Sequence, residues 1–341
     1  MDSSLDALYY YLESNPDLIS GAQEINFYNA KVHKLLDLFN NSSRLSCMQT
    51  FRPYFLQLRS YNLATSTKIE DKCDIAIVDF GKHKQEALWH LGLAIKSLNH
   101  NGKIFAAGSN DLGSKSLQKK LENDYGISLE SYSKKKCRVL TINQKDIPEA
   151  AMEELLDKGN FFKLEGSDLT VSATSFSSKK IDAGSLLLTE YFNQINTKGH
   201  GADFGSGYGY LSYFLLNNKH KASLLDLYEA DYLSLECAKI NLNSFSTNCK
   251  INFNWTDLFS ETPQSNLDWI IMNPPFHLGD KTNAGIGLKF IQSAARSLRS
   301  GGELLMVANR LLPYKKFNKK LFSKHNCLVE KNGFKVILAI K

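Results

Sequence analysis

The strongest constraint on the fold is a pattern that occurs twice in the chain. Residues 74–81 form an apolar run, followed by a helical stretch that reaches Leu98, a glycine-containing turn and a second apolar run to Asn110. The same order of strand, helix, turn and strand runs from Asp268 to Asn309. A repeated supersecondary unit is the sign of an internal duplication. The sequence therefore predicts two domains built on one plan.

The length agrees with two domains, because 341 residues exceed the size at which one hydrophobic core usually stops growing. From about residue 196 onward, apolar runs alternate with helical patterns, which is typical of a parallel sheet covered by helices on both faces. We expect an α/β protein with domains at residues 1–148 and 149–341. A helical linker from Glu149 to Leu156 and a small hairpin between Phe161 and Thr174 would follow the boundary.

A glycine-rich turn follows the apolar run 199–204 and precedes a helical pattern. Gly205, Gly207 and Gly209 would let the backbone turn sharply and approach a ligand. In the dinucleotide-binding fingerprint G-x-G-x-x-G, a third glycine would stand at Tyr210, so a pyrophosphate cradle is disfavoured. The turn alone is a weak signal, because similar turns occur without a ligand.

Acidic residues near the ends of neighbouring runs suit a cationic nucleoside ligand. Asp203 precedes the glycine turn and would place negative charge near the methionine end of S-adenosylmethionine. Glu229 ends the next run, at the spacing from Gly209 at which a carboxylate accepts both ribose hydroxyls. Asp257 can accept a hydrogen bond from the adenine amino group while Leu258 or its neighbour packs on the ring. An aspartate in a turn is also common without any ligand.

The apolar run 267–272 opens into Asn273-Pro274-Pro275-Phe276. The consecutive prolines hold the backbone extended and remove two amide donors. The Asn273 side-chain oxygen and the Pro274 carbonyl remain as acceptors for the two hydrogens of a planar exocyclic amine, and Phe276 can stack on the heterocycle. The pattern predicts methylation of a base nitrogen, with Asn273, Pro274 and Phe276 as the catalytic residues.

These motifs, in this order, resemble class I S-adenosylmethionine-dependent methyltransferases that act on exocyclic or amide nitrogen. Segments 273–277 and 301–314 closely resemble the RsmC family, whose members methylate guanine N2 of 16S ribosomal RNA at the nucleotide conventionally numbered 1207. The resemblance implies S-adenosylmethionine as the cofactor, bound partly at Asn273. It also implies an enzyme of rRNA processing and ribosome biogenesis, with 16S rRNA or the 30S subunit as its partner.

The resemblance extends upstream and also has gaps. Segment 176–188 is similar to the family segment that closes over the methionine end of the cofactor, which implies a cofactor contact for Phe176. Family members usually carry a bulkier apolar residue at Gly201 and often a cysteine at Ser206. Residues 278–282 also differ from the commoner sequence, which leaves the contacts to the target open.

The two copies of the repeat differ where the chemistry would lie. Asp79-Phe80-Gly81 stands where the second copy has Asn273-Pro274-Pro275, and residues 1–70 contain no glycine turn of the required form. We therefore expect two tandem Rossmann-like methyltransferase folds. The N-terminal one would be degenerate, without cofactor, and would serve RNA docking or structural support; the C-terminal one would be catalytic.

Basic residues concentrate in residues 301–341, which hold nine basic and two acidic side chains. Arg310, Lys315 and Lys316 lie there beside aromatic residues. They form either a solvated helix face or a patch that contacts RNA phosphates. His277 would contact RNA or cap the following loop. The run 134–136 is a second basic candidate, for which a solvated turn is the simpler interpretation.

The remaining sequence features exclude several classes. Six scattered cysteines without a C-x-x-C pair suggest neither a zinc site nor a disulfide framework, and we expect no metal. No run approaches membrane-spanning length and no leader is evident, so we expect a cytoplasmic monomer without membrane contact. Three other functions stay open: methylation of guanine N2 in 23S rRNA, methylation of adenine N6 or of protein glutamine, and non-catalytic RNA binding during ribosome assembly.

Overall fold

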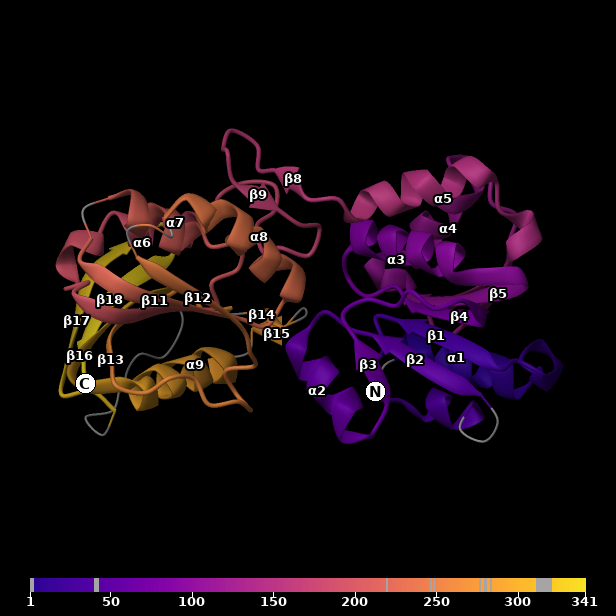
Figure 1. Ribbon diagram of the computed structural model, residues 1–341, viewed down its shortest axis with the longest axis horizontal. Coiled ribbons are helices and arrows are strands. Elements are labelled where there is room, and N and C mark those ends of the chain that lie inside the picture. Colours follow the sequence, from indigo (N-terminus) through magenta and orange to yellow (C-terminus); the bar gives the residue numbers. More distant parts are fainter. Residues whose placement is uncertain are drawn as a thin grey trace. The chain divides into compact units, whose positions relative to one another are not determined.

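The computed structural model forms two compact units, Met1–Asn160 and Phe161–Lys341 (Figure 1). Each unit contains one seven-stranded sheet with helices on both faces. The predicted α/β class and the tandem arrangement of two related folds are confirmed. The residues that the structure describes are 3–39, 43–218, 220–245, 247, 249–275, 277–278, 281–282, 284–310 and 321–341.

The first unit alternates strands and helices until its last strands. Its main helices are α1 (Ser3–Glu13), α2 (Arg52–Ser60), α3 (Lys84–Ser97), α4 (Ser114–Asn123) and α5 (Glu149–Leu156). Its strands are β1 (Glu24–Tyr28), β2 (Arg44–Met48), β3 (Ala64–Ser66), β4 (Cys73–Asp79), β5 (Leu98–Ser109), β6 (Glu130–Lys134) and β7 (Cys137–Asn143).

The second unit begins with a small hairpin, as predicted, and then repeats the same alternation. Its main helices are α6 (Ala183–Thr189), α7 (Tyr210–Asn217), α8 (Tyr232–Leu242) and α9 (Ala284–Ser297). Its strands are β8 (Phe162–Lys163), β9 (Thr170–Val171), β10 (Gly199–Phe204), β11 (Ala222–Glu229), β12 (Lys250–Trp255), β13 (Leu267–Met272), β14 (His277–Leu278), β15 (Lys281–Thr282), β16 (Leu298–Asn309), β17 (Lys324–Lys331) and β18 (Phe334–Ile340).

The two sheets have the same topology. Their strand orders are β3-β2-β1-β4-β5-β7-β6 and β12-β11-β10-β13-β16-β18-β17. In each, the first five strands run parallel and the last two join antiparallel. The registers also agree, since Tyr28 pairs with Met48 and Val78 as Phe204 pairs with Tyr228 and Met272. The internal duplication is therefore present in the fold itself.

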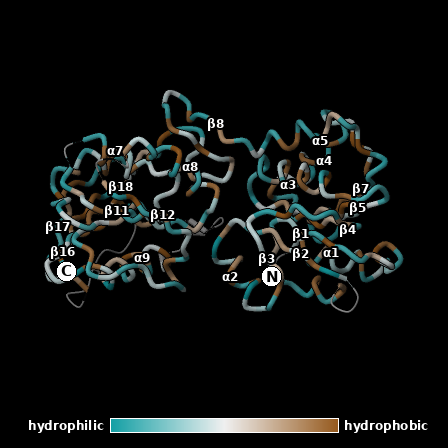
Figure 2. Tube along the Cα trace, in the orientation of Figure 1, coloured by the Kyte–Doolittle hydropathy of each residue, from teal (hydrophilic) through white to brown (hydrophobic). Residues whose placement is uncertain are grey.

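Each central strand is buried on both faces because its side chains alternate between two helix layers. In β4, Ile75 and Ile77 join the core beneath α1, whereas Ala76 and Val78 join the core beneath α3. The second unit repeats this division, with α9 on one face and α6, α7 and α8 on the other. Figure 2 shows hydrophobic stretches of each unit gathered where the helices meet the sheet.

An aspartate near the start of the fourth strand is also duplicated. Asp74 accepts backbone hydrogen bonds from Gln23 and Glu24 and one from the Asn99 side chain. Asp268 accepts one from the His200 backbone at 2.8 Å and one from the Arg299 side chain at 2.7 Å. Each aspartate ties the beginning of the first strand to the beginning of the fifth, so both copies fix their register in the same way.

The units divide after Asn160, later than the boundary predicted at residue 148. The difference is helix α5, which was predicted as a linker and instead packs on α3 within the first unit. Gly92 of α3 permits this approach, because a Cβ atom there would lie 2.7 Å from the backbone nitrogen of Leu156. The burial of Leu155 makes the helix part of the first core.

Gly201, where a bulkier residue is usual in the family that the sequence resembles, has a packing role. It pairs directly with Trp269 across β10 and β13, and the Trp269 side chain is fully buried. A Cβ atom at position 201 would lie 1.9 Å from the indole ring. The indole of Trp269 fills the space that a side chain at position 201 would occupy, so this strand carries glycine where its neighbour carries tryptophan.

We expect Gly201→Ala to lower the free energy of unfolding of the second unit by about 1–3 kcal/mol, because it overpacks a filled core. In a Trp269→Leu background the same change should cost much less, since the two sites share one volume. Urea unfolding of the four proteins, with hydrogen exchange of the β10 and β13 amides to assign the unit, measures both effects. Additive losses would contradict this account.

Candidate functional site

Three neighbouring strands of the second sheet end in register, which brings their following residues to one edge. Phe204, Tyr228 and Met272 form one row of the sheet. The residues that come next along the chain are therefore Gly205, Glu229 and Asn273, side by side. Strand order reverses between β10 and β13, and open α/β sheets bind ligands at such a point, beyond the carboxyl ends of the strands.

The glycine turn after β10 needs its glycines. Gly205, Gly207 and Gly209 have φ angles of 73°, 54° and 84°, in the left-handed region that other residues rarely adopt. Gly209 also lies against α8, where a Cβ atom would meet Ala238 at 3.2 Å. The turn is held by the Gly205 and Ser206 amides, which donate to the Tyr228 carbonyl. Gly205 and Gly207 are only partly buried, so the turn is accessible at the edge where a ligand would approach.

Asn241 of α8 connects this turn to the hairpin β8–β9. Its amide nitrogen donates to the carbonyls of Thr170 and Tyr208, each at 2.8 Å, and its oxygen accepts from the Thr170 amide at 2.7 Å. Because Asn241 is 9% exposed, these bonds are shielded from water. The hairpin and the glycine turn are thus held as one body.

Glu229 accepts three backbone hydrogen bonds at the end of β11. The Gly207 amide donates to one carboxylate oxygen at 2.7 Å, and the amides of Ala230 and Asp231 donate to the other, each at 2.8 Å. Burial nevertheless raises the pKa of the Glu229 carboxyl to about 7, against the lowering effect of these donors. Glu229, the residue predicted to bind the ribose, therefore contacts the glycine turn directly.

Asp203 is fully buried below the turn. One carboxylate oxygen accepts from the Ser212 hydroxyl of α7 at 2.7 Å, and the other has no hydrogen-bond partner in the described part of the chain. Burial raises the pKa of Asp203 to about 7 against the Ser212 hydrogen bond, and the charge of Glu229 acts in the same direction as burial. The buried Asp203 carboxyl thus lies close enough to the partly buried Glu229 for their charges to interact, and this concentration of negative charge suits a positively charged ligand.

Asp257 closes the turn after β12 by its own hydrogen bonds. Its carboxylate accepts from the Phe259 amide at 3.0 Å and from the Ser260 hydroxyl at 2.6 Å. A carboxylate has further lone pairs, so these bonds leave room for a ligand amino group. Leu258 is 5% exposed and packs into the core, so its side chain contributes to the interior. Phe259 remains more exposed, and its ring meets Phe290 edge-on.

Asn273 is partly buried and held by two residues that the sequence prediction did not single out. Its amide nitrogen donates to the Asp182 carboxylate and to the Ser185 hydroxyl, each at 2.8 Å. Asp182 is also the N-cap of α6, where it accepts from the Ser185 backbone amide. Pro274 is buried and Pro275 is exposed. The cap was readable from the pattern Asp-x-x-Ser before an apolar run, but its contact with a residue 91 positions away was not.

The segment that leads to α6 is anchored beside Glu229. Thr174 donates to the Asp231 carboxylate at 2.6 Å, and Ser175 shares a hydrogen bond with Ser234 of α8. The next residue, Phe176, is 66% exposed. An apolar ring so exposed, next to an ordered polar network, is available to cover a ligand at this edge.

The predicted RNA-contacting residues are only partly described. Phe276, Lys315 and Lys316 lie outside the described residues, and His277 is described only as the first residue of β14. Arg310 is exposed beyond the end of β16 and lies 3.6 Å from Glu330, and its backbone amide donates to Gly333. Arg310 therefore sits at the sheet edge that carries Asn273, since β16 and β13 are parallel neighbours.

The equivalent edge of the first unit is filled by its own side chains. By register, Gln49 takes the place of Glu229, Lys31 that of Gly207 and Asp79 that of Asn273. Asp79 is 1% exposed, and its carboxylate pairs with the Lys31 ammonium at 2.5 Å and accepts from Ser4 of α1. Gln49 donates to the Ala30 carbonyl at 2.7 Å. The acids of the second unit are thus replaced here by an amide and an internal ion pair.

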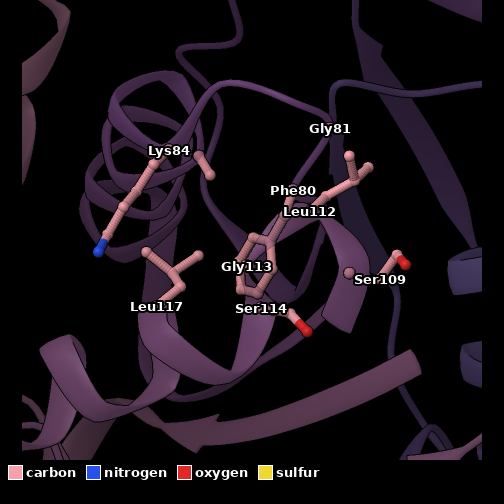
Figure 3. Close-up of a pocket in the computed structure, with 10 residues that line it drawn as sticks. Phe80, Gly81, Lys84, Ser109, Leu112, Gly113, Ser114 and Leu117 are labelled. Carbon is pink, nitrogen blue, oxygen red and sulfur yellow. The ribbon is translucent and has the colours of Figure 1, made fainter. Parts of the chain in front are cut away.

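A pocket lies beside this edge of the first unit (Figure 3). Phe80, Leu112 and Leu117 line it together with Lys84, whose ammonium donates to Ser116. Its described lining residues include no carboxylate. The pocket therefore offers no counterpart of the acidic groups around the glycine turn.

The described residues contain no group of three or more histidine, cysteine, aspartate or glutamate side chains placed to hold a metal ion. Within the same described part of the chain, no helix is both long and apolar enough to cross a membrane.

Comparison with known proteins places both units in one family. The model of the methyltransferase small domain matches residues 167–338, and that of its N-terminal domain matches residues 22–158. Ribosomal RNA small subunit methyltransferase C from Shewanella pealeana is 30% identical over 274 residues, covering 80% of this chain and 79% of the relative. The enzyme of the same name from Actinobacillus pleuropneumoniae is 28% identical, with 85% and 86% covered.

A solved structure has the same fold over nearly the whole length. The 16S rRNA N2 G1207 methyltransferase RsmC of T. thermophilus, in complex with AdoMet and guanosine, covers 93% of this chain and 88% of its own, with a TM-score of 0.75 and 22% identity. The family models, the relatives and the duplicated architecture agree. The chain belongs to the family of ribosomal RNA small subunit methyltransferase C.

Proposed function

We propose that this chain transfers a methyl group from S-adenosylmethionine to the exocyclic N2 of a guanine in 16S rRNA, at the position numbered 1207 in the T. thermophilus relative. The observation that carries the proposal is the placement of Asn273 and Pro274. They stand at the sheet edge that also presents the glycine turn and Glu229. Acceptors for an amine thus lie beside a site for a cationic nucleoside.

The edge fits S-adenosylmethionine by shape and charge. The turn from Gly205 to Gly209 would lie against the cofactor, Glu229 would accept from its ribose and Asp257 from its adenine amino group. The unpartnered oxygen of buried Asp203 supplies negative charge below the methionine end. Phe176 would cover the bound molecule from the exposed side. S-adenosylmethionine supplies a methyl group on a positively charged sulfur, which an amine nitrogen can attack.

The protein's task is to prepare the guanine amine. Its lone pair is delocalised into the ring, so the nitrogen is a poor nucleophile. Acceptance of its two hydrogens by Asn273 and the Pro274 carbonyl favours a pyramidal nitrogen. In-line positioning can lower the barrier by up to roughly 7–11 kcal/mol, and a preorganised polar contact can add about 3 kcal/mol. The methylated amine is cationic and loses its proton readily, so this chemistry needs no general base.

A guanine in a stacked helix cannot reach such an edge, so the target must be flipped out or unpaired. We propose that Phe276 stacks on the extruded base, where a base–aromatic contact is worth about 1–3 kcal/mol. His277, Arg310, Lys315 and Lys316 would contact the surrounding RNA. The first unit would serve docking or support, and the ion pair of Lys31 with Asp79 supports the view that it binds no cofactor.

Incubation with labelled S-adenosylmethionine tests the activity. We expect transfer to the small ribosomal subunit or to free 16S rRNA, and nuclease mapping with mass spectrometry should place one methyl group on guanine N2. A label on 23S rRNA, on adenine or on protein would instead support one of the other interpretations. No transfer to any of these, together with normal cofactor binding, would favour a non-catalytic RNA binder.

Substitutions at equivalent positions of the two units should separate the roles. Asn273→Ala should lower kcat by at least 10²–10³-fold, as for loss of a preorganised polar contact, and leave the Kd for the cofactor nearly unchanged. Glu229→Ala should abolish cofactor binding, whereas Gln49→Ala, its matched control, should leave one bound cofactor per chain. Isothermal titration calorimetry gives affinity and stoichiometry. Two cofactors per chain would contradict the proposal for the first unit.

Cofactor binding should strengthen as pH rises from 6 to 8. Asp203 and Glu229 have pKa values raised to about 7, so both are mostly protonated at pH 6. A cation favours their ionised forms and lowers these pKa values, and protons must leave before it binds tightly. At pH 6 each group should weaken binding by up to about tenfold. The cofactor's own titration is common to all variants, so a pH profile of Asp203→Asn that matches the wild type would refute this origin.

A further inference from the structure

The Asn273 side chain can serve the reaction in only one of its two orientations. A primary amide has an acceptor oxygen and a donor nitrogen at nearly equivalent positions, and rotation by half a turn exchanges them. With the oxygen toward the target, the amide accepts a hydrogen from the amine. With the nitrogen toward the target, two donors would face each other. A selecting contact must therefore exist elsewhere in the protein.

The selecting contact is on the far side of the amide. An ionised carboxylate can only accept, so the amide atom 2.8 Å from the Asp182 oxygen must be the nitrogen. The Ser185 hydroxyl takes the second hydrogen of the same nitrogen at 2.8 Å. Both hydrogens are thereby used, and the Asn273 oxygen is left for another donor. Rotation of the amide would set its oxygen against a negative charge and break both bonds.

Asp182 is itself fixed in place. The carboxylate oxygen that holds Asn273 also accepts from the Ser185 amide at 2.8 Å as the cap of α6. A Cβ atom on Gly184 would press on that oxygen and on the Phe334 ring, each at 3.0 Å, so the glycine keeps the space open. Leu187 and Leu188 anchor the helix in the core. The contact therefore rests on a packed helix.

The first unit shows the alternative. At the position of Asn273 it carries Asp79, whose oxygens face the Lys31 ammonium and the Ser4 hydroxyl. There the acceptors at the end of the fourth strand are already satisfied from within the protein. An acceptor held open toward the outside is thus a property of the second unit.

We propose that Asp182 and Ser185 are positioning residues for methyl transfer, which hold the Asn273 amide with its oxygen toward the target amine. The inference rests on the proposed function and goes beyond it, since it concerns residues that need not touch cofactor or RNA. It predicts losses in kcat at constant cofactor affinity.

Single substitutions test the two contacts. Ser185→Ala keeps the backbone cap and removes one acceptor, and Asp182→Asn can keep an oxygen on the cap while it removes the negative charge that opposes rotation of the Asn273 amide. Each should lower kcat by about tenfold, the equivalent of one hydrogen bond to a charged or neutral partner, with the cofactor Kd within about twofold of wild type. Thr189→Val, which removes a buried hydroxyl bond on the same helix, should leave kcat unchanged. Equal losses in all three, or weakened cofactor binding in place of slower turnover, would overturn the proposal.

A charge swap gives the sharper test. Asn273→Asp alone sets two carboxylates against each other and should lower kcat by at least 100-fold, in line with loss of a preorganised acceptor. In the double variant Asp182→Asn with Asn273→Asp, a small rotation of the new amide keeps its oxygen on the Ser185 backbone amide and lets its nitrogen donate to the new carboxylate. The Ser185 hydroxyl turns from acceptor to donor, and one carboxylate oxygen again faces the target. We expect recovery of at least tenfold over Asn273→Asp.

A double variant no faster than Asn273→Asp, with cofactor binding intact in both, would refute the positioning role. The proposed function fails separately, because it requires that the wild-type chain methylate 16S rRNA in the same assay. An active wild type with no rescue leaves that function standing.

Discussion

The register of β10, β11 and β13 is the constraint on which the site depends. The glycine turn, the carboxylate of Glu229 and the amide of Asn273 come from segments far apart in the sequence. They meet because three parallel strands end in the same row of the sheet. A shift of one residue in any of these pairings would exchange the faces of a strand and carry its terminal group away from the edge. Asp268 limits such slippage by binding the start of β10 and the start of β16.

The same constraint is present in the first unit, although the residues at its sheet edge differ. Asp74 binds at the equivalent place, and the rows of Tyr28, Met48 and Val78 match those of the second unit. The residues after the strands differ between the units, with Gln49 and Asp79 in place of Glu229 and Asn273. Register and edge chemistry can differ independently, because strand register is set by buried pairs in the interior. The residues at the edge take no part in those pairs, so a ligand is the main constraint on their identity.

Local patterns were sufficient to predict much of this molecule. The predicted run 267–272 matches the observed strand Leu267–Met272, and Glu229 ends its strand as predicted, because apolar runs between turn residues leave few alternatives. The duplication was also visible as a repeated order of elements. The domain boundary was harder to predict, because the packing of α5 against α3 depends on Gly92, which is far from α5 in the sequence. The hydrogen bond between Asn273 and Asp182 could not be predicted from the sequence, because only the tertiary fold brings these two residues together.

The burial of individual side chains at the site was not predictable from their positions in the sequence. Leu258 directs its side chain into the core, and Asp203 lies at 0% exposure. Both follow from the alternation of strands and turns once the helices are in place, and neither is visible in spacing alone. Gly201 illustrates the reverse case. A bulkier apolar residue is usual at this position in the family, and the volume of Trp269 on the neighbouring strand explains the glycine.

The ion pair between Lys31 and Asp79 gives the two halves of one chain different dependences on the methyl donor. In the first unit the positive charge beside Asp79 is that of Lys31, so this carboxylate is neutralised by the chain itself and needs no cation from solution. In the second unit, the positive charge beside Asp203 and Glu229 is supplied by the methyl donor from solution. Binding of the donor stabilises the folded form, and this stabilisation increases with the donor concentration. When the donor is scarce, local opening should therefore begin in the catalytic half while its degenerate copy stays closed.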